Sequence, residues 1–472
     1  MRGIRSSVGS LLVVACLDAL PPSAVARLDI IAPDTAAVVG RTLIVEVMAY
    51  DARGARVPAP PLFWSTLDST RAQFAGSGHI VLGPKPGDAA IVVRTSAGVS
   101  DTQWVHGAYE GEVKWKFPIA QGELNSVDGP ALGPDGTVYV LNIPFPGAQN
   151  VSDLYAITPG GDTLWVRRLN ETNSSSHLVG PDGTIYVAGA IVDALTPQGA
   201  TRWTHLIATQ GPFLSGAIRP GTALVLAAEN LFALDPASGD TTWVAARSGN
   251  GAWIIPVSIA RDTLWAKKSG DSLYTFVLNT GALRTLRMPD PDSGRQVSFG
   301  AGPVPVRGLV YVPSAYQLAA FDMTGVRAWS TPQGGLGVSE PAFDATGGLY
   351  VQTTGDGLLA LDAATGHERW RAGIRSRWAW YGGPAVAQGG VVYAAAGGGF
   401  YAYDTSGVRL WEAHEGGATP GPFTGAPAIA PDGTVYTYTD TCVYAFWASH
   451  PPEPNSPWPM WRHDAQRSGV AR

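Results

Sequence analysis

The sequence holds only two cysteines, Cys16 and Cys442, in 472 residues. Because Cys16 lies in the first twenty residues, the rest of the chain has no cysteine pair for a disulfide, and its stability has to come from packing. Charged residues make up only 15% of the chain, the formal net charge is −6, and no cluster of Lys or Arg stands out. This balance argues against a nucleic-acid partner, because binding to a phosphate backbone needs concentrated positive charge.

The chain also lacks a long apolar run. Two arginines precede a short apolar stretch, residues 8–15, that is too brief to span a bilayer, so residues 1–26 are predicted to be an export leader and tether. Two cleavage sites compete: one before Cys16, in a pattern that resembles a bacterial lipobox, and one after Ala26. We favour a lipidated Cys16, because Asp18 interrupts the apolar core that the later site needs. This predicts an extracytoplasmic protein of the cell envelope, held to a membrane by a lipid anchor alone.

What is abundant is glycine, proline and tryptophan, with 58, 37 and 16 copies, a composition typical of short strands joined by tight turns. Residues 27–107 alternate between apolar and polar side chains and predict a small β-sandwich. This stretch resembles the bacterial Ig-like (group 2) domains at Pro33, Gly40, the turn at residues 51–54 and the strand that holds Trp64. Trp64 is predicted to lie in the sandwich core rather than to bind a ligand.

From residue 111 onward the sequence repeats itself. Seven times a glycine is followed four residues later by tryptophan, and an eighth copy at Gly281 has Thr285 in the tryptophan position. Apart from a longer first interval, the copies lie about 40 residues apart, which is the period of a four-stranded propeller blade. The seven tryptophans, predicted to be structural anchors that fill the gaps between blades, are Trp115, Trp165, Trp203, Trp243, Trp329, Trp370 and Trp411.

The ends of the repeat predict how the ring closes. The strand around Trp115 comes before any other strand of its blade, whereas the last unit has strands near residues 435 and 443 but no glycine–tryptophan strand of its own. If the early strand completes the last unit, residues 111–450 form an eight-bladed β-propeller. The degenerate unit at residues 248–288 leaves seven blades as the alternative. We therefore expect an all-β chain: an Ig-like sandwich, a propeller, and an aromatic tail at residues 451–472 that packs on the ring.

The repeat region resembles the PQQ-like β-propeller family. The resemblance rests on an Ala-x-Asp…Gly-x-x-x-Trp pattern, which is complete in four units, and on the tail segment 458–464. The family includes quinoprotein dehydrogenases, which hold pyrroloquinoline quinone and calcium, and non-catalytic members such as the propeller lipoprotein of the outer-membrane β-barrel assembly machinery. The dehydrogenases use adjacent cysteines, which this chain lacks. We therefore predict no catalytic, cofactor-binding or metal-binding residue, and interpret Cys442 as a buried thiol.

These features favour a monomeric, non-catalytic scaffold that binds a protein or another envelope component through loops on one propeller face. The alternative is a carbohydrate-binding or quinoprotein sugar-oxidising module, with PQQ and calcium as cofactors in the second case. Its motivation is the aromatic segment at residues 377–381, Arg-Trp-Ala-Trp-Tyr. Aromatic residues in such a segment more often pack between blades than bind sugars.

Overall fold

The computed structural model divides the chain into two compact units, Met1–Ala108 and Tyr109–Arg472. The structure describes residues 24–119, 129–142, 152–169, 176–189, 191–207, 215–227, 230–245, 253–268, 272–289, 301–314, 317–332, 337–374, 382–396, 398–414, 423, 425–460 and 462–471. Within these ranges all regular secondary structure is β, as the sequence predicts.

From residue 24 onward, the first unit consists of three small sheets around one apolar core. Their strand orders are β1 (Arg27–Ile31), β4 (Glu46–Tyr50) and β5 (Arg56–Val57); β2 (Ala36–Val38), β10 (Ser100–Ala108), β9 (Gly87–Thr95) and β6 (Leu62–Thr66); and β3 (Thr42–Ile44), β8 (His79–Leu82) and β7 (Ala72–Phe74). Trp64 packs against the core, with its ring stacked on that of Phe74 at a centroid distance of 4.6 Å. Membership of the Ig-like family stays a prediction.

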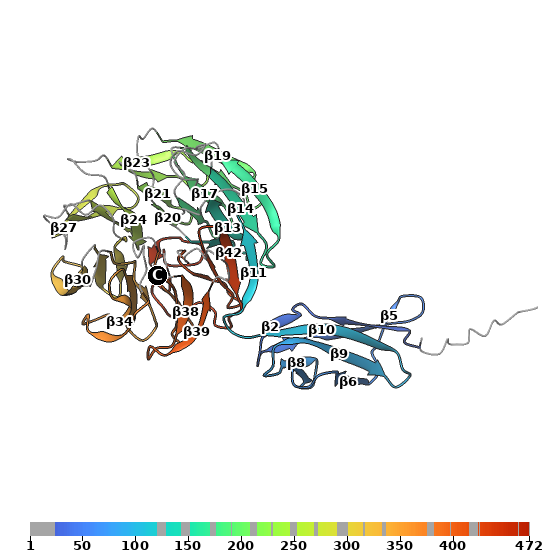
Figure 1. Ribbon diagram of the computed structural model, residues 1–472. Helices are drawn as coiled ribbons and strands as arrows, with labels where there is room; N and C mark the ends of the chain where they lie inside the picture. Colours follow the sequence, from blue (N-terminus) through green and yellow to red (C-terminus); the bar gives the residue numbers. More distant parts are fainter. Residues whose placement is uncertain are drawn as a thin grey trace, which may run out of the picture. The chain divides into compact units, whose positions relative to one another are not determined.

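The second unit forms eight sheets in its described part, arranged as a ring (Figure 1). Each sheet is one blade, and we number the blades along the chain. Blades 1 to 3 are β12 (Ala131–Leu132), β13 (Val138–Asn142), β14 (Ser152–Ile157) and β15 (Thr163–Leu169); β16 (Ser176–Val179), β17 (Ile185–Ala188), β18 (Ile191–Leu195) and β19 (Thr201–Leu206); and β20 (Ser215–Arg219), β21 (Ala223–Ala227), β22 (Leu231–Leu234) and β23 (Thr241–Ala245).

Blades 4 to 6 continue the same pattern. They are β24 (Trp253–Ala260), β25 (Thr263–Lys268), β26 (Ser272–Val277) and β27 (Leu283–Pro289), joined by β43 (Val470–Ala471); β28 (Val304–Val306), β29 (Leu309–Pro313), β30 (Gln317–Asp322) and β31 (Arg327–Pro332); and β32 (Ala342–Phe343), β33 (Gly348–Thr353), β34 (Gly357–Asp362) and β35 (Glu368–Ala372). The degenerate unit therefore forms a blade despite having Thr285 in place of the tryptophan.

Blades 7 and 8 complete the ring. Blade 7 is β36 (Ala385–Ala387), β37 (Val391–Ala396), β38 (Gly399–Tyr403) and β39 (Arg409–His414), and blade 8 is β40 (Ala428–Ile429), β41 (Val435–Tyr438) and β42 (Cys442–Phe446) with β11 (Val113–Pro118) as its outer strand. Strand β11 pairs antiparallel with β42, and Trp115 lies opposite Ala445. The early strand thus completes the last blade as the sequence predicts, and the eight sheets correspond to the larger of the two expected blade numbers.

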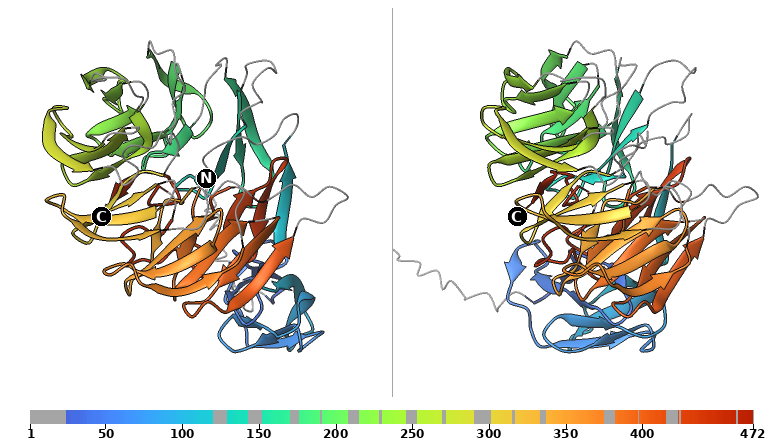
Figure 2. Two further views of the ribbon diagram at one scale, coloured as in Figure 1. Left: turned by 60° about the vertical axis from the view of Figure 1, so that its left-hand side comes forward. Right: turned by 90° about the vertical axis from the view of Figure 1, so that its left-hand side faces the viewer.

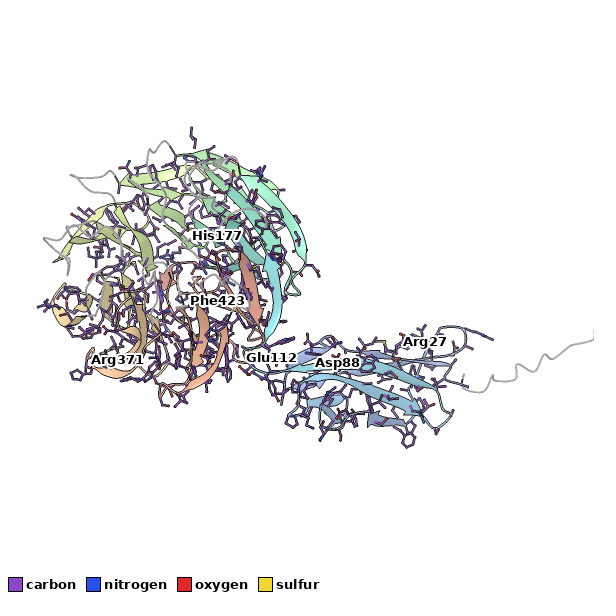
Figure 3. The ribbon with its side chains drawn as sticks, in the orientation of Figure 1. Arg27, Asp88, Glu112, His177, Arg371 and Phe423 are labelled. Atoms are coloured by element: carbon purple, nitrogen blue, oxygen red, sulfur yellow. The ribbon has the colours of Figure 1, made fainter. Side chains whose placement is uncertain are left out.

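Burial changes from the centre of the ring to its rim. The middle strands, such as β13 and β37, are buried throughout, whereas an outer strand such as β35 exposes most of its side chains. Figure 3 shows Arg371 of β35 at the rim and His177 of β16 nearer the centre. Cys442 is a buried free thiol at the start of β42. The ring is therefore held by apolar packing between blades rather than by cross-links.

Candidate functional site: the tail across the ring

The predicted anchor tryptophans lie at the junctions between neighbouring blades. Each one pairs across its own sheet with an alanine, as Trp203 does with Ala194, so that the small residue leaves room beside the indole. A Cβ atom added to the glycine of the next repeat copy would come within 2.5–3.1 Å of the same indole. The glycines that contact these rings are Gly111, Gly161, Gly199, Gly239, Gly281, Gly366 and Gly407. The glycine of each of these repeat copies therefore packs against the tryptophan of the preceding copy, across the junction between two blades.

A hydrogen bond fixes each of these indoles except one. The Nε1–H groups donate to a carbonyl oxygen in the next blade at 2.7–3.0 Å, in the pairs Trp115–Pro159, Trp165–Pro197, Trp203–Pro236, Trp243–Leu278, Trp329–Ala363 and Trp370–Thr405. Trp411 is the exception, because its buried Nε1 has no hydrogen-bond partner in the described part of the chain. The turn between third and outer strand that would supply the carbonyl is missing in blade 8, since its outer strand comes from the start of the unit.

The repeated aspartates cap the turns that carry these glycines. Asp235, Asp322, Asp362 and Asp404 each accept, through Oδ1, the backbone N–H two residues ahead, at 2.7–3.1 Å. These bonds are of the kind that stabilise Asx turns. The four aspartates therefore have the same structural role in their blades, as turn caps.

The tyrosines of the second strands are also structural. Burial is the main cause that raises the pKa of Tyr139, Tyr186 and Tyr311 to about 12 in each case. These phenols therefore stay protonated at neutral pH. Tyr311 donates its hydroxyl hydrogen to the Ala363 carbonyl oxygen at 3.1 Å, in the next blade. Such side chains stabilise blade junctions and are poorly suited to accept or release a proton in a reaction.

The C-terminal tail, residues 451–471, binds to the end of the ring where the innermost strands end. Six of these strands, in the described residues, donate one backbone N–H each, from equivalent positions, to a tail carbonyl oxygen at 2.7–3.0 Å. The pairs are Leu132–Ala465, Val179–Gln466, Ile218–Ser468, Ile259–Gly469, Phe343–Trp458 and Val386–Pro459. The matching position in blade 5 is Pro305, which has no N–H to donate. The right-hand view of Figure 2 shows the C-terminus towards one end of the ring.

Buried polar side chains hold the tail across the centre. Glu340 of blade 6 accepts, through Oε1, the indole N–H of Trp458 at 2.8 Å and the backbone N–H of Arg462 at 2.7 Å. The Arg462 guanidinium donates to the Gly216 carbonyl oxygen in blade 3. Arg467 donates from Nε and Nη2 to the Pro130 carbonyl oxygen, at 3.0 and 2.8 Å. The tail thus links blades on different sides of the ring.

A pocket of about 370 Å³ lies beside the tail. Residues from the inner strands and turns of blades 1 to 3 form one side of it, and the tail forms the other. We call it the tail pocket, and its lining residues are Pro134, Val179, Pro181, Ile218, Pro220, His463, Asp464, Gln466, Ser468 and Val470. Burial opposes ionisation of Asp464, but hydrogen bonds from His463 and Ser468 hold the pKa of its carboxyl below the ordinary value.

Several predicted features fall outside the described residues: the lipidation site Cys16, the aromatic segment 377–381 and Trp461 of the tail. No helix in the described ranges is long and apolar enough to cross a membrane. Across the same ranges no group of three or more His, Cys, Asp or Glu side chains could hold a metal ion. Sequence reasoning predicted that the tail packs on the ring but missed Glu340, the acid buried beneath it. In the sequence, the only sign of Glu340 is that an acidic residue stands among small and apolar neighbours just before an inner strand.

Comparisons with known proteins identify relatives of the ring. A family model described as "Outer membrane protein assembly factor BamB" matches residues 150–338 and 314–446. The crystal structure of BamB from Moraxella catarrhalis is 17% identical and has a TM-score of 0.51, covering 71% of this chain and 100% of that one. The computationally designed Ika8 protein is 15% identical with a TM-score of 0.51, covering 69% of this chain and all of the designed one.

A curated relative matches a smaller part. The serine/threonine-protein kinase AfsK of Streptomyces griseus is 33% identical over 154 residues, which are 30% of this chain and 19% of the kinase. The chain thus spans about a fifth of the length of that relative. The C-terminal WD40 domain of Sif2 has a TM-score of 0.55 at 10% identity, covering 72% of this chain and 98% of that domain. The structural likenesses establish a β-propeller fold.

Proposed function

The chain belongs to the family described as outer membrane protein assembly factor BamB, and from this premise we propose that it is a non-catalytic scaffold that binds a protein partner. The observation that carries the proposal is the filled centre of the ring. Trp458, Arg462 and Arg467 of the chain's own tail are almost completely buried there. A planar quinone at this end of the ring would have to displace them, so the residues at the tail end do not fit that cofactor.

The partner surface is proposed at the end of the ring opposite the tail. The tail and the tight turns after the inner strands occupy the first end, through the hydrogen bonds of Leu132, Val179 and their equivalents. Rigid blades position the connections at the other end, and binding residues are commonly found on loops that a rigid framework supports. Those connections include residues outside the described ranges.

The experiment is a quantitative pull-down with the purified mature chain as bait in a cell-envelope extract. The designed Ika8 protein is the matched control, because it shares the fold. We expect at least one envelope protein to be enriched by this chain and not by the control. The same preparation is then incubated with PQQ, calcium and an electron-accepting dye over a panel of sugars. Sugar-dependent dye reduction, or the absence of any enriched protein, would contradict the proposal.

We also propose that the chain is exported and tethered to the cell envelope through lipidated Cys16. Support comes from the lipobox-like sequence before Cys16 and from the family's printed name, which refers to the outer membrane. Metabolic labelling with palmitate in the native host tests the site directly. Label should enter the wild-type chain and be lost in Cys16→Ser. Label that persists in the variant would place the lipid on another residue, and the absence of label from the wild-type chain would favour cleavage after Ala26.

A further inference from the structure

The tail pocket combines apolar walls with a single fixed carboxylate. Three prolines, Pro134, Pro181 and Pro220, come from equivalent turns of three consecutive blades, and Val179 and Ile218 lie just before two of these turns. All three prolines are exposed, so the pocket opens at the surface. Its volume of about 370 Å³ is near the lower end for ligand sites, which suits a short side chain or a small molecule.

Asp464 lies on the tail side of this pocket in a fixed orientation. Its Oδ1 accepts the Ser468 backbone N–H at 2.8 Å, and its Oδ2 accepts the Ser468 hydroxyl at 2.5 Å and faces His463 Nδ1 at 3.1 Å. The side chain is still 23% exposed. A carboxylate can accept about four hydrogen bonds, so Oδ1 retains a position for one more donor.

The charge of Asp464 has little compensation from the protein. Within the described residues, the only basic side chain in ion-pair distance is that of His463. Its hydrogen bonds nevertheless keep the carboxyl ionised, since they lower its pKa. An anion in a mostly apolar pocket favours a cation that carries apolar surface, because the ligand then satisfies the charge and covers the walls together.

From these contacts we propose that the tail pocket binds an alkylammonium group, with the ammonium donating to Asp464 and the alkyl chain lying against the three prolines. One remaining acceptor position suits a point-like ammonium better than a guanidinium, whose fork needs two acceptors. The group can belong to a lysine side chain of a protein or to a free small amine. The assignment concerns the tail end of the ring and does not depend on partner binding at the opposite end.

The test is a titration of the full mature chain with three ligands of matched size: n-butylammonium, 1-butanol and butyrate. Saturation-transfer NMR measures the binding of each ligand. We expect saturable binding of n-butylammonium with a Kd on the order of 1–10 mM, because few atoms make contact. Binding of 1-butanol should be weaker by about tenfold or more, since it lacks the charge-assisted hydrogen bond, and butyrate should not bind. Equal affinity for all three ligands would overturn the proposal.

Two variants locate the site. Asp464→Asn keeps an oxygen for the Ser468 N–H but loses the charge, so n-butylammonium should bind no better than 1-butanol. Because Asp464 also shapes the tail, Pro181→Trp provides an independent variant that obstructs the pocket from an exposed turn. Ala345→Trp is its matched control, at the equivalent exposed position of blade 6 outside the pocket. Undiminished binding in Pro181→Trp would place the amine elsewhere and overturn the assignment.

A fourth ligand distinguishes the two sources of the ammonium group. Nα-acetyl-lysine methylamide carries the same alkylammonium on a peptide-like backbone. If its Kd is within about tenfold of the Kd of n-butylammonium, the pocket admits a lysine of a protein, because the exposed turns leave room for the attached backbone. Binding of n-butylammonium alone assigns the pocket to small free amines. Failure of both ligands overturns the proposal but leaves the pull-down result unaffected.

Discussion

Seven of the blade junctions in the described residues depend on a glycine that leaves space for an indole. At Gly239 an added Cβ would lie 2.5 Å from Cε3 of Trp203, and the backbone has φ +79°. Gly308 has the same φ, but nothing lies within 4 Å of its Cβ position. We expect Gly308→Ala to cost about 1 kcal/mol of folding free energy from the left-handed backbone alone. Gly239→Ala should cost about 1–3 kcal/mol more, because it adds overpacking. Urea unfolding of both variants measures the difference, and equal midpoints would show that the indole simply moves aside.

The unpartnered indole of Trp411 permits a comparison with Trp370, which donates to the Thr405 carbonyl oxygen at 2.8 Å. Replacement by phenylalanine removes the N–H group and part of the ring in both cases. At Trp370 it also leaves a carbonyl oxygen without its donor. We therefore expect Trp370→Phe to be more destabilising than Trp411→Phe by about 1–2 kcal/mol in urea unfolding. A larger loss at Trp411 would indicate that a bound water satisfies its N–H.

Asp344 is expected to make the stability of the ring depend on pH in the acid range. Burial favours its neutral form, but N–H bonds from Thr346 and Gly348 and the Tyr350 hydroxyl outweigh burial and lower its pKa. A pKa lower in the folded state than in the unfolded state stabilises the protein above the unfolded value, ordinarily near 3.8, and this contribution is lost as pH falls through the folded value.

Asp344→Asn tests this dependence. At pH 7 we expect the variant to be less stable than wild type by about 1.5–3 kcal/mol, because charge-assisted hydrogen bonds are lost. Below pH 4 the gap should narrow, since the wild-type carboxyl becomes protonated and loses the same contribution. Urea unfolding at several pH values measures the gap. A difference that stays constant from pH 7 to pH 3 would contradict the role of the charge.

The tail is the element that most affects the inner strands. A chain that ends at Asp464 lacks the four carbonyl oxygens that accept the N–H groups of Leu132, Val179, Ile218 and Ile259. At about 0.5–1.5 kcal/mol for each bond, we expect a loss of about 2–6 kcal/mol of folding free energy. Hydrogen exchange provides the residue-level measurement. Those four amides should exchange faster in the truncated chain.

The N–H groups of Phe343 and Val386 are the internal controls, because Trp458 and Pro459 remain in the truncated chain. If all six amides exchange faster to the same extent, the tail acts as one cooperative unit and not through separate hydrogen bonds. If none changes, the tail carbonyls contribute nothing to the inner strands.

The blade repeat could be predicted from the sequence because it consists of local patterns. Most repeat copies have a glycine at a turn, which contacts the indole of the preceding copy, and a tryptophan four residues later. The early strand at Trp115 comes before the other strands of its unit, which predicts that it joins the last blade. The tail could only be predicted to pack on the ring. Its contacts use backbone carbonyls at residues 458, 459, 465, 466, 468 and 469, a spacing with no period, and they meet amides whose side chains vary. The tail pocket was missed for the same reason, since its walls come from four separate segments.

Closure of the ring is the feature on which its integrity depends. Strand β11 reaches blade 8 from the start of the unit, and its pairing with β42 and the packing of Trp115 help to retain it there. Trp203 makes the same kind of junction, but its strand β19 is joined to β18 by a short turn.

Trp115→Ala and Trp203→Ala should each lose about 3–5 kcal/mol of folding free energy. In Trp115→Ala, however, release of β11 exposes the edge of β42, and exposed edges pair with other chains. We therefore expect a concentration-dependent dimer and rapid proteolysis within residues 109–119 for Trp115→Ala and not for Trp203→Ala, measured by light scattering and limited digestion. Identical behaviour of the two variants would mean that the ring stays closed without the indole, and that the β11–β42 pairing alone is sufficient.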